Sequence, residues 1–188
     1  MGEYVFNKYC PTDPSTNKTS VTGCVATALA QVLNYYKMPK TLPDSVISYT
    51  TESRGIALNK RLSDIPLDWG NMSDWYKDKR NGYPTTTAAQ RNAVGHLMYA
   101  CGLSVRMDYG SGSSSASCYN SPYALIKFFR YNPNISYLRR AYYSDEEWTD
   151  MIQTELSAGR PIIYDGRKDD SGHSFLLVGC DDSDRYTT

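Results

Sequence analysis

The sequence predicts an α+β fold in which a helical part packs on an antiparallel sheet. Apolar residues recur at helical spacing in four separate segments, and a strand–turn–strand pattern follows the last of them. The length of 188 residues is enough for one domain with a full core and too short for two ordinary domains. Residues 1–188 are therefore expected to form a single domain.

The strongest helical pattern begins at about Gly23 and ends before Met38 and Pro39. Residues 1–20 precede it and are rich in Pro, Thr, Ser and Asn, which is typical of extended chain and loop. The apolar residues at helical spacing in this segment are Val25, Ala28, Leu29, Val32, Leu33 and Tyr36. Since small residues fill the positions between them, we expect this helix to be central and buried.

Weaker patterns follow this helix. Residues 40–82 carry scattered Pro and Gly and predict mostly loops and short elements. Residues 85–102 predict a second helix that stops at Gly102. A strand is expected over 103–110, and a flexible Gly/Ser loop over 110–117. A third helix is expected over 123–131.

The fourth helix and the segment after it have the clearest boundaries. Ser144 and Glu147 have the spacing of a capping box, and a glycine and a proline follow the helical pattern. The strand patterns 160–167 and 173–181 flank the turn 168–172, which predicts an antiparallel hairpin with His173 at the start of its second strand.

Composition excludes several classes of function. Twenty basic and twenty acidic residues give no net charge, so no overall field would recruit nucleic acid or an anionic membrane. Apolar runs fall short of the roughly 20 residues of a membrane span, and nothing near the N-terminus resembles a signal peptide. Five irregularly spaced cysteines and two histidines indicate neither a disulfide framework nor a metal site, and we expect no cofactor.

Cys24 is the first candidate for chemistry, because it lies where the first helix begins. Unpaired N–H groups and the helix dipole stabilise a thiolate at such a position, and the thiolate is the reactive form. The alternative is a buried free cysteine that only packs, since cysteine is among the most buried residue types. Periodicity and composition alone favour that alternative.

A catalytic thiol needs a base, and the sequence offers His96 and His173. His96 lies within the second helix, which gives it no reason to face Cys24. His173 follows Ser171 and Gly172, whose small side chains leave the ring uncrowded at a strand start. It comes about 150 residues after Cys24, which is typical of papain-like proteases. A hydrogen-bonded structural histidine remains an equal alternative at this point.

Local sequence then indicates a family. The segments TGCVATALAQVLNYYKMP, GLSVRMDYGSGSSSA and EEWTDMIQTELSAGRPIIYDGRKDDSGHSFLLVGCD, together with FNKYCP, resemble the streptopain family of secreted bacterial cysteine proteases, which includes the interpains. The four segments occur in the family's order across most of the chain and include both the thiol and the histidine.

This resemblance implies a papain-like fold and endopeptidase activity on protein or peptide substrates. It implies Cys24 as the nucleophile, whose backbone N–H would help to form the oxyanion hole, and His173 as the general base. It also implies that the substrate cleft is bordered by small residues, namely Ser113, Ser115, Ala116, Ser171 and Gly172. A propeptide or an inhibitor is a further expected partner, and the expected location is secreted, periplasmic or at the bacterial cell surface.

Two family features are not found in this sequence. One is an oxyanion-hole glutamine just upstream of the segment that matches VFNKYCP, and the other is an Asn-Trp-Gly-Trp-Gly segment after the histidine strands. The expected fold is therefore a papain-like domain truncated at both ends. The alternative to an active peptidase is a degenerate or truncated domain that binds peptides or an inhibitor without turnover.

Overall fold

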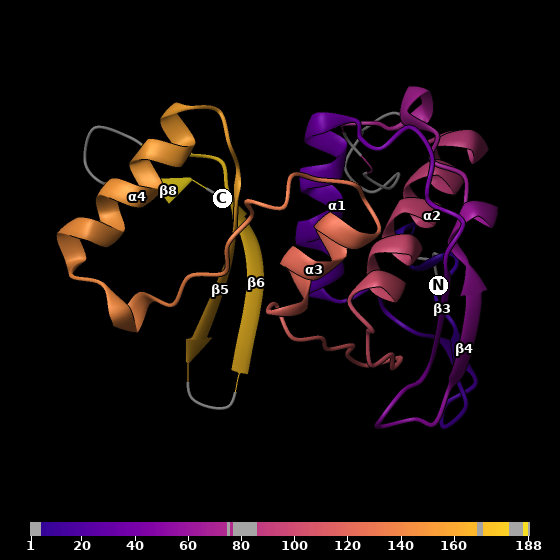
Figure 1. The fold of residues 1–188 in the computed structure, drawn as a ribbon. Coiled ribbons are helices and arrows are strands. Elements are labelled where there is room, and N and C mark those ends of the chain that lie inside the picture. Colours follow the sequence, from indigo (N-terminus) through magenta and orange to yellow (C-terminus); the bar gives the residue numbers. More distant parts are fainter. Residues whose placement is uncertain (1–4, 75, 77–85, 169–170, 181–185, 188) are drawn as a thin grey trace.

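The computed structural model describes residues 5–74, 76, 86–168, 171–180 and 186–187, with the backbone alone for 180, 186 and 187. Figure 1 shows two parts side by side: α1, α2 and α3 with the β3–β4 hairpin, and α4 with the β5–β6 hairpin. Every pairing among the described strands is antiparallel. The predicted α+β class is confirmed.

The elements of the first part run from residue 5 to residue 127. They are η1 (Val5–Asn7), β1 (Thr12–Asp13), β2 (Lys18–Thr19), α1 (Cys24–Tyr36), β3 (Val46–Thr50), β4 (Ala57–Arg61), η2 (Leu62–Asp64), η3 (Trp69–Asn71), α2 (Ala88–Ser104) and α3 (Asn120–Lys127). The second part contains η5 (Arg140–Tyr142), α4 (Asp145–Ser157), β5 (Ile162–Lys168), β6 (Ser171–Leu177), β7 (Gly179–Cys180) and β8 (Tyr186–Thr187).

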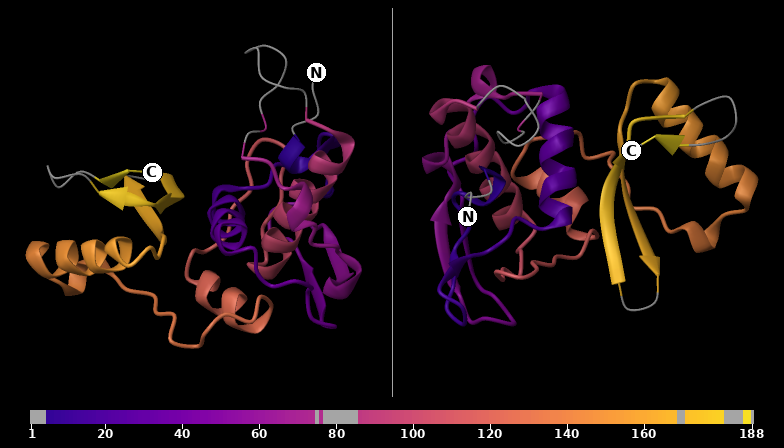
Figure 2. Two further views of the ribbon diagram at one scale, coloured as in Figure 1. Left: turned by 90° about the horizontal axis from the view of Figure 1, so that it is seen from above. Right: turned by 180° about the vertical axis from the view of Figure 1, so that it is seen from behind.

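Helix α1 is central, as its apolar pattern predicts. Leu29 and Leu33 are fully buried in the main core, and Lys37 ends the helix in a left-handed conformation with its N–H donated to the Leu33 carbonyl. In the views of Figure 2, α1 lies on the side of the first part that faces the β5–β6 hairpin. One helix therefore serves both the main core and the boundary between the parts.

Helix α2 continues past the predicted stop at Gly102 and ends at Ser104. Gly102 is a packing residue, because a Cβ at this position would overlap the hydroxyl of the fully buried Tyr109. The strand predicted over 103–110 is also wrong: its first two residues are helical, and Asp108 forms only an isolated bridge with Ser115. Residues 110–117 are a loop, as predicted.

Two further segments need a closer description than the sequence gives. Residues 46–61 lie in the segment predicted as mostly loops and short elements, and they form the β3–β4 hairpin of two five-residue strands; alternate residues of β3 are buried, among them Ile47 and Tyr49. The third helix begins at Asn120 and ends at Lys127, earlier at both ends than the apolar pattern indicated. In both cases packing against the core, rather than local pattern, sets the element.

The second part agrees closely with expectation. Ser144 and Glu147 form both hydrogen bonds of the capping box that starts α4. β5 and β6 pair over seven residues each, with Gly166 opposite His173 and Tyr164 opposite Phe175. Strand β6 begins at Ser171, so His173 is its third residue rather than its first.

Buried apolar side chains form two clusters. The larger one lies among α1, α2 and the β3–β4 hairpin and includes Leu29, Leu97 and Phe129. The smaller one contains Ala28, Val32 and Leu176, and it joins α1 to β6. This smaller cluster sets how closely the histidine strand approaches the cysteine helix.

Among the helices in the described ranges, none combines the length and the apolar character that crossing a membrane requires.

Candidate active site

Cys24 is the first residue of α1 and is half-buried. Gly23 before it has a positive φ of 85° and offers no side chain to the first N–H groups of the helix. A Cβ at Gly23 would lie 2.8 Å from the Met107 sulfur and 3.0 Å from the Ser114 carbonyl oxygen, so only glycine fits here. The thiol therefore stands at a helix N-terminus, where backbone N–H groups favour negative charge.

The segment before Cys24 is held from two sides. On one side, Val21 donates its N–H to the Gly110 carbonyl (3.0 Å), and Ser114 Oγ donates to the Val21 carbonyl (2.6 Å). On the other side, Thr22 donates its N–H to Asn7 Oδ1 (2.9 Å) and its hydroxyl to the Phe6 carbonyl (2.8 Å). These contacts fix the path of the chain into the helix.

His173 lies on the opposite wall, exposed on β6. Its ring stacks on Phe175, with centroids 6.0 Å apart. Ser174 points to the other face of the strand; it is buried and donates its hydroxyl to Asp165 Oδ1 on β5 at 2.9 Å. The imidazole thus stands on a paired strand rather than on a loop, which gives it a rigid mount.

Cys24 and His173 both line one cleft of about 940 Å³. Its walls come from α1, from β6 and from the connection between α4 and β5. The lining residues include Gly23, Cys24, Thr27, Ala28, Gln31 and Tyr35 on the helix side, and Pro161, His173, Ser174, Phe175, Leu176 and Val178 on the strand side. A pocket of this size with a thiol on one wall and an imidazole on the other can support nucleophilic catalysis.

The other five predicted site residues lie near this cleft but are absent from its described lining. Ser113 and Ser115 are exposed and Ala116 is half-buried, on the loop whose Ser114 carbonyl approaches Gly23. Ser171 and Gly172 are exposed on β6 directly before His173, and Ser171 Oγ donates to the Lys168 carbonyl. Their assignment as substrate contacts stays a prediction.

The second histidine and three further cysteines are absent from the described lining of this cleft. His96 stacks on Tyr9 with centroids 4.0 Å apart, and burial, aided by Lys8 and Lys60, lowers its pKa. The thiols of Cys10, Cys101 and Cys118 are free and buried. Burial raises the pKa of Cys10 to about 11 and that of Cys101 well above its ordinary value. Such thiols are poor nucleophiles at neutral pH.

Sequence reasoning missed two groups of residues. The first is the α1 face beyond Cys24, including Gln31 and Tyr35, which lines the cleft. Helical spacing from Cys24 identifies that face once the cysteine is taken as the site. The second is Asp13, a fully buried carboxylate outside the motif that contains Cys24. Its Asp-Pro-Ser sequence is a turn signal and gave no sign of burial.

Among the described residues, no three His, Cys, Asp or Glu side chains cluster as metal ligands.

Comparison with known proteins places the chain in a family. Residues 2–188 match the model of the Peptidase C10 family. Streptopain of Streptococcus pyogenes serotype M28 is 32% identical over 190 residues, which cover 97% of this chain and 46% of streptopain. This chain therefore spans about half the length of that relative.

Solved structures agree with the family match. The Prevotella intermedia prointerpain A fragment superposes with a TM-score of 0.83 and 32% identity over 98% of this chain and 56% of its own. Active wild-type interpain A from the same organism superposes with a TM-score of 0.79 and 34% identity over 94% of this chain and 72% of its own. The predicted papain-like fold and the resemblance to streptopain are confirmed, and the chain belongs to the Peptidase C10 family.

Proposed function

We propose that this chain carries the catalytic centre of a cysteine endopeptidase, with Cys24 as nucleophile and His173 as general base. The observation that carries the proposal is the placement of these two residues on opposite walls of one cleft. Family membership supports the same reaction class. Protein or peptide substrates would occupy the cleft, as would a propeptide or an inhibitor.

In the proposed reaction, His173 takes the Cys24 proton and the thiolate attacks the scissile carbonyl. The Cys24 backbone N–H, free at the helix N-terminus, donates to the oxyanion that forms. Collapse of the tetrahedral intermediate expels the amine, which takes the proton from His173, and leaves a thioester on Cys24. Water, activated by His173, then hydrolyses the thioester and restores the thiol.

The proposal includes export from the bacterial cell, because the sequence resembles a family of secreted proteases. Its catalytic part is tested with an epoxysuccinyl inhibitor and casein. We expect the inhibitor to label Cys24 and Cys24→Ala to abolish casein turnover, with a loss of at least about 10³-fold. Cys118→Ala is the matched control, because this thiol is free but buried, and its turnover should stay within about 3-fold of wild type.

Three results would contradict the proposal. They are labelling confined to other cysteines, turnover that survives Cys24→Ala, and Cys24 labelling without any casein turnover. The last result would identify a binding module instead of a peptidase.

A further inference from the structure

Asp13 is a fully buried carboxylate, and its contacts join three distant parts of the chain. Oδ1 accepts the N–H and the hydroxyl of Ser15, at 2.9 and 2.6 Å. Oδ2 accepts the N–H and the hydroxyl of Ser111, both at 2.9 Å, and Arg54 Nε at 3.4 Å. Both oxygens are therefore fully used, which is how a buried charge is made tolerable.

The residue at the far end of these contacts, Ser111, belongs to the loop 110–115, here termed the serine loop. Thr16, from the turn that follows Asp13, also donates its hydroxyl to Ser111 Oγ at 2.8 Å. The serine loop in turn holds Val21 through Gly110 and Ser114 and presses the Ser114 carbonyl against Gly23. A chain of direct contacts thus runs from Asp13 to the residue that precedes Cys24.

We infer that Asp13 is a positioning residue that fixes the serine loop beside the Cys24 end of the cleft, where the loop meets bound peptide. This inference rests on the proposed function and deepens it. Asp13 would thus fix the position of the serine loop, whose sequence is rich in Gly and Ser and has little intrinsic preference for any one conformation.

The charge state of Asp13 agrees with this role. Hydrogen bonds from the Ser15 hydroxyl and the Ser111 backbone hold the pKa of the carboxyl well below its usual range. The group is thus a carboxylate throughout the neutral range and accepts on both oxygens. Asparagine has the same shape but only one acceptor oxygen, so its amide group would meet either the Ser15 or the Ser111 donors. Asp13→Asn therefore breaks the anchor without opening a cavity.

The backbone before Cys24 is also held independently of the serine loop, because Thr22 donates hydrogen bonds to Asn7 and Phe6. Loss of Asp13 should loosen the loop while Cys24 keeps its place. We therefore expect Asp13→Asn to raise KM for peptide substrates by about 10-fold, the equivalent of one or two good hydrogen bonds, and to leave kcat within about 2-fold. Alkylation of Cys24 by iodoacetamide should stay within about 2-fold of wild type.

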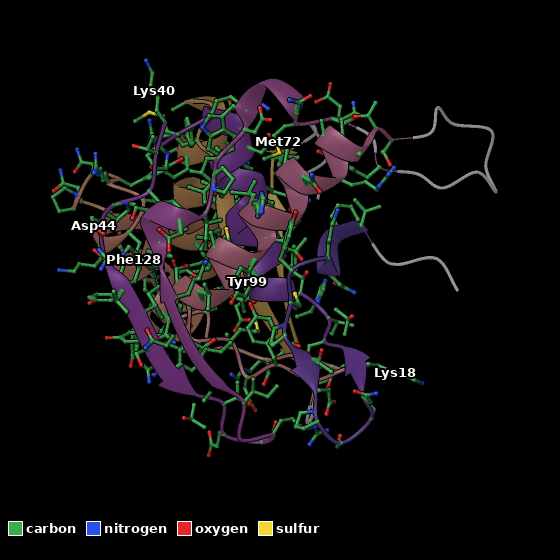
Figure 3. All side chains as sticks on the ribbon, turned by 90° about the vertical axis from the view of Figure 1, so that its right-hand side faces the viewer. Lys18, Lys40, Asp44, Met72, Tyr99 and Phe128 are labelled. Atoms are coloured by element: carbon green, nitrogen blue, oxygen red, sulfur yellow. The ribbon has the colours of Figure 1, made fainter. Side chains whose placement is uncertain are left out.

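The control is Asp44→Asn, which removes the same charge from an exposed aspartate that pairs with Arg61. Figure 3 shows Asp44 on the opposite side of the molecule from Lys18, the strand partner of Asp13. Should Asp13→Asn not fold, Ser111→Ala replaces it. This variant keeps the Ser111 N–H bond to Asp13 and loses the two bonds of the Ser111 hydroxyl, to Asp13 Oδ2 and from Thr16, so a rise in KM of about 2- to 3-fold is expected.

Amide hydrogen exchange separates this inference from the proposed function. Exchange at Gly110, Ser111 and Ser115 should accelerate by about 10-fold or more in Asp13→Asn and not in Asp44→Asn, whether or not the chain hydrolyses peptides. Unchanged loop exchange would overturn the inference. So would a fall in Cys24 alkylation in proportion to kcat/KM, since that result would show a general loss of structure. Absence of wild-type turnover with faster loop exchange would reject the peptidase and keep the anchor.

Discussion

The imidazole of His173 lies stacked on the ring of Phe175, with the two planes inclined by 22°. Phe175 belongs to a row of aromatic rings. The Tyr164 ring centroid lies 5.6 Å from that of Phe175, and the Trp148 centroid of α4 lies 6.1 Å from that of Tyr164. Trp148 Nε1 also donates to the Tyr164 hydroxyl at 3.2 Å. Helix α4 thus supports the face of the hairpin that carries the histidine.

Phe175→Leu tests this support. Since an aromatic pair contributes about 0.5–1.5 kcal/mol beyond its area, we expect kcat for peptide hydrolysis to fall by about 2- to 10-fold. Phe128→Leu is the control, a half-buried phenylalanine that packs on Tyr123 outside the cleft lining. Equal effects in both variants would refute a role for the stacking.

Gly23→Ala should impair both stability and thiol reactivity. The positive φ alone costs a residue with a Cβ about 1–2 kcal/mol, and the Cβ would also press on Met107 and on the Ser114 carbonyl. Gly55→Ala is the matched control, since Gly55 also has a positive φ of 63° but has open space around it. Urea unfolding should show a larger loss for Gly23→Ala, and only that variant should slow Cys24 alkylation. Similar losses would mean that the close contact is unimportant.

Alkaline pH should destabilise the fold through Cys10. Its folded pKa is about 11 against an ordinary value of 9.0, so the unfolded chain loses this proton first as pH rises. The stabilisation is complete below pH 9 and is lost as pH rises through 11. Burial raises the pKa values of Tyr49 and Tyr109 as well, so the loss of stability continues to higher pH.

Urea midpoints measured from pH 8 to 11 check this expectation. Cys10→Ala should lower the free energy of unfolding at pH 8. The further decrease of this free energy between pH 8 and pH 11 should be smaller than in wild type. Ser144→Ala, which removes a helix cap worth about 1 kcal/mol and no titrating group, should keep the wild-type slope. A Cys10→Ala variant with the wild-type slope would exclude this thiol as a cause.

Ser174→Ala should lower the free energy of unfolding by about 1–3 kcal/mol, because the partly buried Asp165 carboxylate loses the hydrogen bond that the Ser174 hydroxyl donates to it. Ser63→Ala removes a comparable bond to the exposed Asp44 and should stay within about 0.5 kcal/mol of wild type. Chemical denaturation of the two variants gives the comparison. Equal stability would indicate that water replaces the Ser174 hydroxyl.

Local sequence predicts those elements whose own residues determine them. Helix α1, the capping box at Ser144 and the β5–β6 hairpin are of this kind. The sequence misassigned Gly102, because its role depends on Tyr109 and not on helix termination. It predicted only unspecified short elements where β3–β4 lies, because the buried residues of this hairpin gain their place from the main core. Local sequence left Cys24 and His173 open as a catalytic pair until the family resemblance favoured them, since the cleft that both line exists only after α1 packs on β6.

The small cluster of Ala28, Val32 and Leu176 joins α1 to β6, so it is the pivot for any rotation of one element relative to the other. Leu176 stands three residues from His173, a lever of about 10 Å at 3.3 Å per strand residue. A rotation of about 10° at the pivot would move the imidazole by nearly 2 Å, whereas proton transfer requires heavy atoms within about 2.6–3.2 Å of each other. Three modest apolar side chains would thereby set the tolerance of the proposed reaction, in which they take no chemical part.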